Sequence, residues 1–304
     1  CPASSAENRV PLITPGSELE KVIIFGASGF IGKNLHAHIQ QKTNLEITGY
    51  SSSESDLLDL PQVEEALKNC DRGTSIVLCS AIPRRKEDSW AAMLKNITMV
   101  HNVCVGIPAA GVRSFVFISS ADVYGAHPGI ATINEETPAN PKNHYGVSKL
   151  ASEMMLPIEL PPQTPISILR LPGVYGAGDQ GNSIVGVFVE KLLRGETIDV
   201  TGEGKAKRDY LHVKDLCQVV DTFLRQPFSG VVNVATGVST SIVETAMIAA
   251  KVLGKAPAVK LVPSTAEEYN LIFDTGRLTQ LMPKMRFMKL EKGITEYAES
   301  YKKS

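Results

Sequence analysis

Tyr145 and Lys149 stand four residues apart in the segment YGVSK. On a helix, this spacing places the phenol and the ammonium group on the same face. A nearby cation favours the phenolate, so the pair predicts a Tyr145 pKa below the reference value of about 10. A tyrosine tuned toward neutrality can move a proton on and off an alcohol oxygen. The same spacing also occurs on helices that do no chemistry, so the pair needs support from other segments.

Ser120 stands at the end of an apolar run over residues 114–119, which predicts a buried strand. Ligands of parallel sheets bind at the carboxyl ends of the strands. A hydroxyl at this place can therefore hydrogen-bond the substrate oxygen on which Tyr145 acts. The alternative is that Ser119 and Ser120 cap a turn.

Three glycines, Gly26, Gly29 and Gly32, follow a run of apolar, mostly β-branched residues at 22–25. The run predicts a strand, and apolar residues after the glycines recur at the four-residue spacing of one helix face. Gly26 permits a tight turn, Gly29 lets a pyrophosphate approach the backbone, and Gly32 lets helix and strand pack closely. The amino end of the helix offers N–H groups to phosphates. The segment predicts the first βα unit of a dinucleotide-binding fold rather than a simple turn.

Strand and helix patterns alternate through residues 21–172, which predicts a parallel sheet covered by helices on both faces. The expected fold class is α/β, a doubly wound Rossmann sheet with a smaller, mixed α/β substrate lobe. Residues 173–304 form mainly this lobe, interleaved with the first part, and residues 1–20 are an N-terminal extension or a remnant of cloning or processing. The expected strands are 22–25, 45–50, 75–79, 114–119, 166–171, 197–201 and 231–235, the last two in the smaller lobe; the expected helices are 61–70, one capped by Ser89, 145–156 stopped by Pro157, 184–194, one capped by Asp215, and 241–253.

The composition limits the classes of partner. The 304 residues carry a formal net charge of −1, so charge gives no argument for nucleic-acid or membrane partners. No apolar run reaches the ~18 residues of a membrane span. Five cysteines without a C-x-x-C pair predict buried, reduced thiols and a cytoplasmic setting. The six histidines show no metal-ligand spacing, so no metal site is expected.

Five motifs, in their order along the chain, resemble the extended short-chain dehydrogenase/reductases, the group of sugar-nucleotide epimerases, dehydratases and reductases. The motifs are the glycine loop at 26–32, FISSADVYG at 117–125, YGVSK at 145–149, LRLPGVYG at 169–176 and RDYLHVKDL at 208–216. The resemblance spans residues 21–280.

The resemblance implies a role for each matching residue. Tyr145 would be the general acid/base, Lys149 would bind the nicotinamide ribose, and Ser120 would hold the sugar oxygen. Arg208 would grip the nucleotide diphosphate, because a guanidinium fork suits phosphate oxygens; the alternative is a surface ion pair with Asp209. The implied cofactor contacts are Gly26, Ser28, Gly29, Phe30, Ile31, Gly32, Ser51, Asp56 and Leu57 at the adenine, Ala81, Asn96, Tyr145, Lys149 and Pro172. The implied substrate contacts are Ser120, Asp122, Tyr145 and Arg208.

Three departures from the family pattern concern the substrate. Ala121-Asp122 stands where dehydratases of the family carry Asp-Glu, which argues against elimination of water. Gly173 stands where many members have an asparagine that contacts phosphate. A second phosphate-gripping arginine is not evident at residues 262–274, and Arg277 and Lys260 are the available substitutes.

A fourth departure concerns the cofactor. The second expected strand ends in GYSSS at 49–53, without the acid that takes the adenosine ribose hydroxyls. The serines can bond a 2′-phosphate, although no arginine stands beside them. The sequence therefore leans to NADP over NAD.

The expected activity is that of an NAD(P)-dependent oxidoreductase on a nucleotide-activated sugar, either a 4-epimerase or a 4-keto reductase. The alternative from another class is a non-catalytic nucleotide-sensing protein on the same fold. A homodimer is expected through the helices that begin near Ser89 and Tyr145, the first with an apolar stripe of Met93, Ile97, Val100 and Cys104. The basic run 84–86 is expected to be solvated rather than a substrate contact, and Trp90 is expected to pack in the core.

Overall fold

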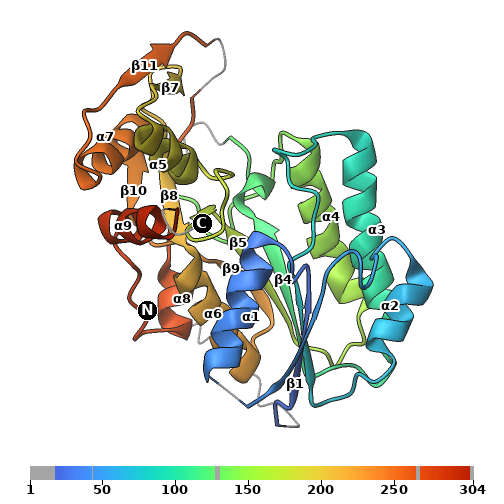
Figure 1. Ribbon diagram of the computed structural model, residues 1–304. Coiled ribbons are helices and arrows are strands. Elements are labelled where there is room, and N and C mark those ends of the chain that lie inside the picture. The colour runs from blue at the N-terminus through green and yellow to red at the C-terminus, as the bar shows by residue number, and fades with distance from the viewer. Residues whose placement is uncertain (1–17, 43, 127–130, 265–267, 302–304) are drawn as a thin grey trace, which may run out of the picture.

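The large sheet of the protein is parallel throughout. The computed structural model describes residues 18–42, 44–126, 131–264 and 268–301. Within them, six strands pair in the order β2-β1-β3-β4-β5-β9 (Figure 1). The strands are β1 (Lys21–Phe25), β2 (Glu46–Tyr50), β3 (Thr74–Leu78), β4 (Ser114–Ser120), β5 (Ile166–Leu171) and β9 (Gly230–Asn233). The strand order reverses between β1 and β3, which is the place where open α/β sheets bind ligands.

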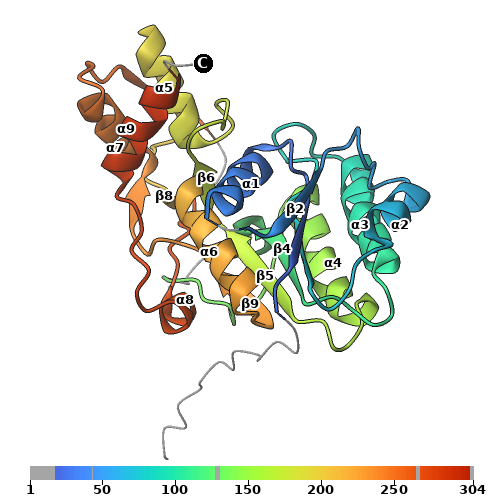
Figure 2. The same ribbon diagram turned by 60° about the horizontal axis from the view of Figure 1, so that its bottom comes forward.

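Helices cover both faces of this sheet, as Figures 1 and 2 show. One face carries α1 (Phe30–Lys42) and α6 (Val213–Arg225), and the other carries α2 (Leu60–Leu67), α3 (Trp90–Gly106) and α4 (His144–Glu159). Because side chains alternate along a strand, Val22 and Ile24 of β1 join the core under α1 and α6, whereas Ile23 and Phe25 join the core on the other face. The predicted doubly wound α/β fold is confirmed.

Most of the remaining elements form a smaller part, at the upper left in Figure 1. β6 (Gly173–Tyr175), β8 (Lys207–His212) and β10 (Ser239–Ser241) form one sheet, and β7 (Ile198–Thr201) pairs with β11 (Val259–Val262). The helices of this part are α5 (Ile184–Arg194), α7 (Ile242–Val252) and α9 (Leu290–Tyr301), whereas α8 (Gly276–Leu281) packs on β9 and its Leu278 joins the core under α1 and α6. α5, α7 and α9 enclose a separate apolar core with Tyr175 and Ile198.

Three expected elements differ in the structure. Pro157 does not stop α4, which runs to Glu159 because Pro157 falls in its last turn and Leu160 N–H still donates to Leu156 O at 3.0 Å. Asp215 does not cap α6; the imidazole of His212 takes that place, and Asp215 accepts from Met288 N–H at 2.8 Å. The strand expected at 231–235 is β9, and it extends the large sheet beside β5 instead of the smaller part.

The expectations about the N-terminal extension and about membrane-spanning helices can be compared only with the described residues. Residues 1–17 of the expected N-terminal extension lie outside them. Among the helices of the described ranges, none is long and apolar enough to cross a membrane.

The turn between β1 and α1 requires glycine at two places for different reasons. Gly26 has a φ of +85°, a left-handed conformation that residues with a Cβ rarely adopt. Gly32 lies one turn into α1, where a Cβ would stand 2.1 Å from the carbonyl oxygen of Gly26. That oxygen belongs to backbone fixed between β1 and the turn, so it cannot move away freely.

The substitution Gly32→Ala should therefore destabilise the protein by about 1–3 kcal/mol, the range for overpacking a tight site. Thermal unfolding measures the loss as a lower Tm. Gly29→Ala is the matched control, since its Cβ would meet the same oxygen at 3.3 Å. Equal unfolding temperatures for Gly32→Ala and the wild type would contradict the close approach of α1 to β1.

Candidate functional site

The predicted site residues gather at the carboxyl ends of the strands of the large sheet. The glycine loop and the start of α1 supply residues 26–32, Ser51 follows β2, Asp56 and Leu57 precede α2, and Ala81 follows β3. Asn96 lies on α3, Ser120 ends β4, Tyr145 and Lys149 lie on α4, and Pro172 follows β5. Asp122 lies in a short 3₁₀ turn after β4, and Arg208 comes from β8 in the smaller part.

Tyr145 and Lys149 share one face of α4, as their spacing predicts. Asn143 caps the helix by accepting from Gly146 N–H at 2.7 Å, which fixes the first turn that carries Tyr145. Lys149 is 4% exposed, and its Nζ donates to Ile118 O at 2.7 Å. The same Nζ lies 5.6 Å from the centre of the Tyr145 ring. The ammonium group is thus held next to the phenol and anchored to β4.

The predicted lowering of the Tyr145 pKa is wrong for the structure as it stands. Burial raises the pKa of Tyr145, the charge of Asp122 raises it further, and Arg84 opposes the shift. Burial also lowers the pKa of Lys149 to about 8, with Cys79 and Glu153 working against that change. Tyr145 is therefore a protonated phenol near neutral pH, which makes it a proton donor in this state.

Ser120 combines both of the arrangements that its sequence permits. Its Oγ accepts from Asp122 N–H at 3.1 Å, so it caps the 3₁₀ turn at 121–123. Its side chain also lines a cavity of about 230 Å³, together with Asp122 and Pro172. The hydroxyl of Ser119 donates instead to Glu153 Oε1 at 2.5 Å and has no place in the cavity.

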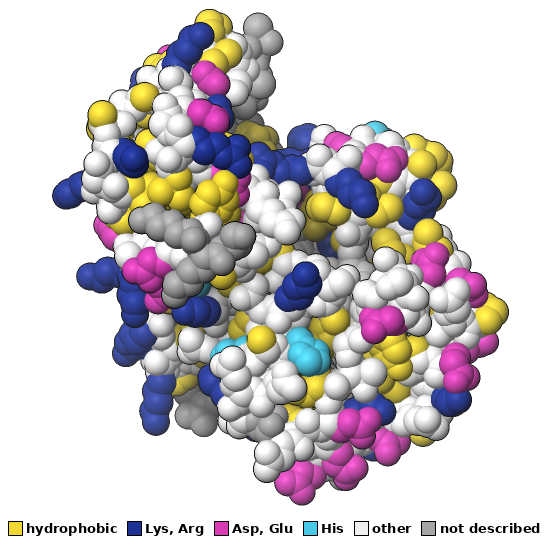
Figure 3. All heavy atoms as spheres, viewed as in Figure 1, with side chains coloured by type: hydrophobic (Ala, Val, Ile, Leu, Met, Phe, Trp, Pro, Cys, Tyr) yellow, Lys and Arg dark blue, Asp and Glu magenta, His cyan; other side chains and the backbone are white. Residues whose placement is uncertain are grey.

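Three guanidinium groups line this cavity. Arg208 comes from β8, and Arg84 and Arg85 come from the segment between β3 and α3. Arg84 pairs with Asp122 at 3.4 Å across the cavity, and Arg85 donates to the carbonyl oxygens of Gly181 and Asn182. Arg84 and Arg85 are exposed, as expected of a solvated run, but both also line this cavity. In Figure 3, Lys and Arg side chains gather where the surface is hollowed between the two parts of the molecule.

Arg208 does not form a surface ion pair with Asp209. Asp209 is 1% exposed and accepts from Thr236 N–H at 3.0 Å and from Gly237 N–H at 2.8 Å. Arg208 donates through Nη1 to Tyr269 O at 2.6 Å and stacks over the ring of Tyr269 at 5.0 Å. Burial lowers the pKa of Arg208 but leaves the group a cation.

The two substitutes expected for a second phosphate-gripping arginine lie elsewhere. Arg277 donates to Glu136 Oε1 at 2.7 Å and to Val231 O at 2.9 Å, so it braces β9. Lys260 is an exposed residue of β11 and does not line the cavity. Arg84 and Arg85 are the cations that the fold brings beside Arg208.

A second cavity, of about 450 Å³, lies against the glycine loop. Ser28, Lys33, His36, Ser51 and Glu54 line it. Glu54 Oε2 accepts from Ser51 N–H at 2.8 Å and from Ser51 Oγ at 2.6 Å, and these bonds lower the pKa of Glu54. A carboxylate thus stands four residues after the end of β2 and lines the same cavity as Lys33 and His36 of α1.

Sequence reasoning missed Lys33, His36 and Glu54 as residues of this cavity. Lys33 and His36 stand three residues apart and share one face of α1, which was the available signal. Glu54 lies three residues after Ser51, the spacing of a capping side chain, but only the folded loop shows which acceptor Ser51 takes.

Asn96 and Asp56 have structural partners. Asn96 Oδ1 accepts from Ile82 N–H at 2.7 Å, and its Nδ2 donates to Ile82 O at 3.1 Å and to Ser148 Oγ at 3.3 Å. It therefore holds the segment after β3 against α3 and α4. Asp56 accepts from Leu58 N–H at 3.0 Å, and Asn102 Nδ2 donates to Leu57 O at 2.8 Å.

Sequence reasoning also missed a buried network behind Tyr145 and Lys149. Glu153, eight residues after Tyr145, faces Arg170 of β5, and the closest oxygen–nitrogen distance is 2.6 Å. Arg170 lies 4.8 Å from the centre of the Tyr124 ring, and Tyr124 Oη donates to Asn233 Oδ1 at 2.7 Å. The continuation of the four-residue spacing from 145 to 149 to 153 was the available signal.

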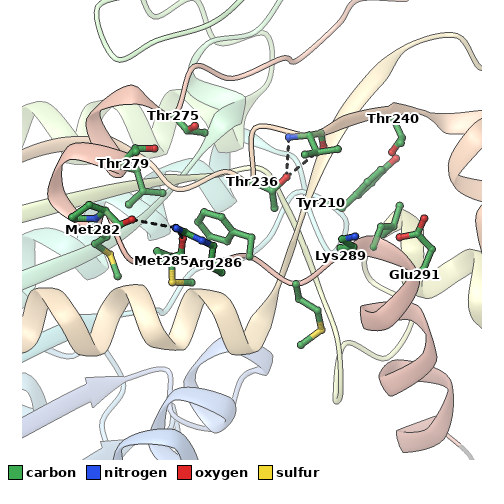
Figure 4. A pocket seen from close by; sticks show the side chains of 16 residues that line it. Tyr210, Thr236, Thr240, Thr275, Thr279, Met282, Met285, Arg286, Lys289 and Glu291 are labelled. Carbon is green, nitrogen blue, oxygen red and sulfur yellow. Dashed lines mark hydrogen bonds between the residues drawn. The ribbon is translucent and has the colours of Figure 1, made fainter.

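A further cavity of about 540 Å³ shares no residue with the predicted site. Tyr210 and Thr240 lie on one side of it, and Met282, Met285 and Arg286 of the segment after α8 lie on the other (Figure 4). In the described ranges, no group of three or more His, Cys, Asp or Glu side chains is placed to hold a metal ion.

The chain is similar to proteins of known activity. A family model described as "NAD dependent epimerase/dehydratase family" matches residues 22–235. A UDP-glucose 4-epimerase of Bacillus subtilis is 28% identical over 273 residues, which cover 81% of this chain and 78% of the relative. The crystal structure of a Thermotoga maritima UDP-glucose 4-epimerase with UDP-glucose superposes with a TM-score of 0.83 at 21% identity, covering 93% of this chain and 99% of that one. The structure of RMD from Pseudomonas aeruginosa with NADPH gives a TM-score of 0.81 at 20% identity, covering 93% and 99%.

Proposed function

Because the chain belongs to the NAD-dependent epimerase/dehydratase family, we propose that it oxidises or reduces carbon 4 of a nucleotide-activated sugar. The resemblance that the five motifs indicate is confirmed at the level of this family. One observation carries the finer proposal. A protonated Tyr145, paired with Lys149, stands at the same strand ends as a cavity lined by three guanidinium groups.

The residues present fit a nicotinamide dinucleotide. α1 begins at Phe30 directly after the glycine turn, and such a helix end presents N–H groups to phosphates. A bound nicotinamide supplies hydride to the sugar carbon or accepts it. Tyr145 would donate its proton to the sugar oxygen in reduction and take it back in oxidation, with Ser120 orienting that oxygen. Lys149 would hold the ribose and stabilise the phenolate that forms.

The guanidinium groups support a substrate with a diphosphate. Arg208 would bind the phosphates, and Arg85 lines the same cavity. Arginine presents planar donors that match phosphate oxygens. Two carboxylates, Asp122 and Asp209, line the cavity beside these three guanidinium groups, so its lining retains a positive charge.

Ala121 argues against dehydration of the sugar. Its side chain is 4% exposed and belongs to an apolar cluster with Val123, Tyr124 and Phe273. This position thus carries a methyl group packed on apolar side chains instead of the acid that dehydratases of the family carry. The proposed reaction is therefore either 4-epimerisation or 4-keto reduction.

We further propose a weak preference for NADP over NAD. Lys33 and His36 line the 450 Å³ cavity together with Ser51 and Ser53 of the loop after β2. A 2′-phosphate would lie in this cavity. Glu54 limits this preference, because its carboxylate lies on Ser51 and repels a phosphate.

A homodimer through α3 and α4 is also part of the proposal. Of the ten exposed large hydrophobic side chains among the described residues, six lie on these two helices. Met154 and Ile158 are 65% and 81% exposed, one turn apart on α4. The stripe expected on α3 lies mostly within the protein, since Met93, Val100 and Cys104 are buried, and Trp90, expected to pack, is 64% exposed. A different set of apolar residues is thus offered to a second copy.

We also propose that the protein works in a reducing compartment such as the cytoplasm. Among the described residues, Cys70, Cys79, Cys104 and Cys217 are free thiols. Burial raises the pKa of Cys104 and of Cys217 to about 12, which keeps them unreactive.

Tyr145→Phe should lower kcat by about 10²–10⁴, the contribution of a general acid/base, with little change in Tm or cofactor affinity. The assay uses UDP-, GDP- and dTDP-hexoses and their 4-keto forms, followed by NAD(P)H absorbance and by chromatography of the epimers. Tyr301→Phe, at the end of α9, is the control. Near-normal turnover by folded Tyr145→Phe would remove Tyr145 from the mechanism, and nucleotide binding without any turnover by the wild type would favour the sensing alternative.

Lys33→Gln should weaken NADPH binding by about three- to tenfold and leave NADH binding unchanged, because only NADPH carries the 2′-phosphate. Ser51→Asp should shift the cofactor preference from NADPH toward NADH. Fluorescence titration gives the dissociation constants, and Lys42→Gln at the far end of α1 is the control. The proposal fails if the wild type already binds NADH at least tenfold more tightly, about 1.4 kcal/mol.

The double substitution Met154→Glu and Ile158→Glu should convert the dimer into a folded monomer, because burying two carboxylates in an apolar interface is costly. Light scattering at micromolar concentration measures the mass. Met247→Glu, at an exposed apolar residue of α7, should leave the dimer intact. A monomeric wild type at this concentration would overturn the interface.

A further inference from the structure

The turn between β7 and β8 donates five consecutive backbone N–H groups to side chains of one distant segment. Glu268 Oε1 accepts from Glu203 N–H at 2.5 Å and from Gly204 N–H at 3.0 Å. Glu268 Oε2 accepts from Lys205 N–H and Ala206 N–H, both at 3.1 Å. The next N–H, that of Lys207, donates to Asn270 Oδ1 at 2.9 Å. A single carboxylate thus takes four donors of the turn.

The turn is shaped for this carboxylate. Gly202 and Gly204 have φ values of +75° and +67°, which allow successive N–H groups to converge on one side. A Cβ on Gly202 would stand 2.1 Å from Glu268 Oε1, so the close approach requires glycine there. Desolvation works against ionisation of Glu268, but the hydrogen bonds from the turn hold the pKa of its carboxyl below the usual value.

The segment held in this way reaches the cavity through Arg208. Tyr269, next to Glu268, supplies the carbonyl oxygen that accepts from Arg208 Nη1 at 2.6 Å and the ring on which the guanidinium lies. Leu271 N–H donates to Lys207 O at 3.0 Å, and Leu271 itself lines the 230 Å³ cavity. Arg208 therefore takes its orientation from residues that Glu268 fastens to the turn.

We propose that Glu268 is a positioning residue for substrate recognition, which fastens residues 268–271 to the β7–β8 turn so that Arg208 is held ready for the diphosphate of the nucleotide sugar. This inference rests on the proposed function, since it assigns the diphosphate to Arg208. Among the described residues, the hydrogen-bond donors to Glu268 are backbone N–H groups, and Glu268 is not one of the groups proposed to contact the substrate. Its removal should therefore weaken binding of the substrate and leave the chemical step intact.

Glu268→Gln keeps the size of the side chain but replaces one acceptor oxygen with an NH₂ group, which faces two N–H donors of the turn. Glu268→Asp keeps the charge but is one methylene shorter, so it cannot reach both pairs of donors. We expect KM for the nucleotide sugar to rise about tenfold in Glu268→Gln and less in Glu268→Asp, with kcat within about twofold of wild type. The dissociation constant for NADPH should not change.

Calorimetry with UDP, GDP and dTDP as probes measures the same loss without turnover, and hydrogen exchange at the amides of residues 203–207 reports whether the turn has loosened. Glu65→Gln, at an exposed carboxylate of α2, is the matched control and should behave as wild type in every measurement. The positioning role is overturned if exchange rises in Glu268→Gln while affinity for the diphosphate stays at the wild-type value, or if kcat falls and KM does not change. Failure of the wild type to bind any of the three diphosphates, with NADPH binding retained, would instead overturn the proposed function.

Discussion

The buried ion pair between Glu153 and Arg170 decides where the reactive side chains of this protein lie. The two side chains are 4% and 8% exposed and meet at 2.6 Å, and Ser119 of β4 donates to the same carboxylate. Such a pair adds little net stability, because desolvation offsets most of the attraction, but removing one partner costs about 3–5 kcal/mol. Its effect is on register. Glu153 fixes the rotation and height of α4 against β4 and β5, and Lys149 and Tyr145 follow at one and two turns along the same face.

The site needs both parts of the molecule. Tyr145, Lys149 and Ser120 come from the large sheet and its helices, whereas Arg208 comes from β8 of the smaller part. The two groups meet because β9 and α6, which follow β8 in the chain, return to the large sheet. In the proposed function, Arg208 would hold one end of the substrate by its charge and the large sheet would present the other end to the phenol of Tyr145. Arg84 and Arg85, whose segment is held by Asn96, are the other guanidinium groups that line the cavity of Arg208, whereas Arg277 braces β9.

Local patterns predicted most of the fold, and most of the candidate site residues that they indicate lie together at the carboxyl ends of the strands. A few neighbouring residues determine the glycine turn at 26–32 and each apolar strand. The structure has the turn and these strands where the sequence predicts them. What failed depended on contacts between distant segments. The pKa of Tyr145 is set by burial and by Asp122, which the YGVSK segment does not contain. The position of Arg85 is set by carbonyl groups almost a hundred residues later in the chain. The rotation of α1 about its axis determines that the charge of Lys33 lies beside Ser51 in the cavity. Pro157 is a strong local signal for the end of a helix, yet α4 continues to Glu159. Pro157 lies in the last turn of α4, where few helical hydrogen bonds are lost.

The position of α6 has a consequence for synthesis on the ribosome. β1 begins at Lys21, but the helix that completes the apolar core on one of its faces is Val213–Arg225, almost two hundred residues later. Until α6 has left the exit tunnel, Val22, Ile24, Val116 and Leu169 share a core that lacks the side chains of Leu216, Val220 and Phe223. The nascent chain must carry an incompletely covered sheet while the residues between β1 and α6 are synthesised, and chaperones are suited to protect such a sheet.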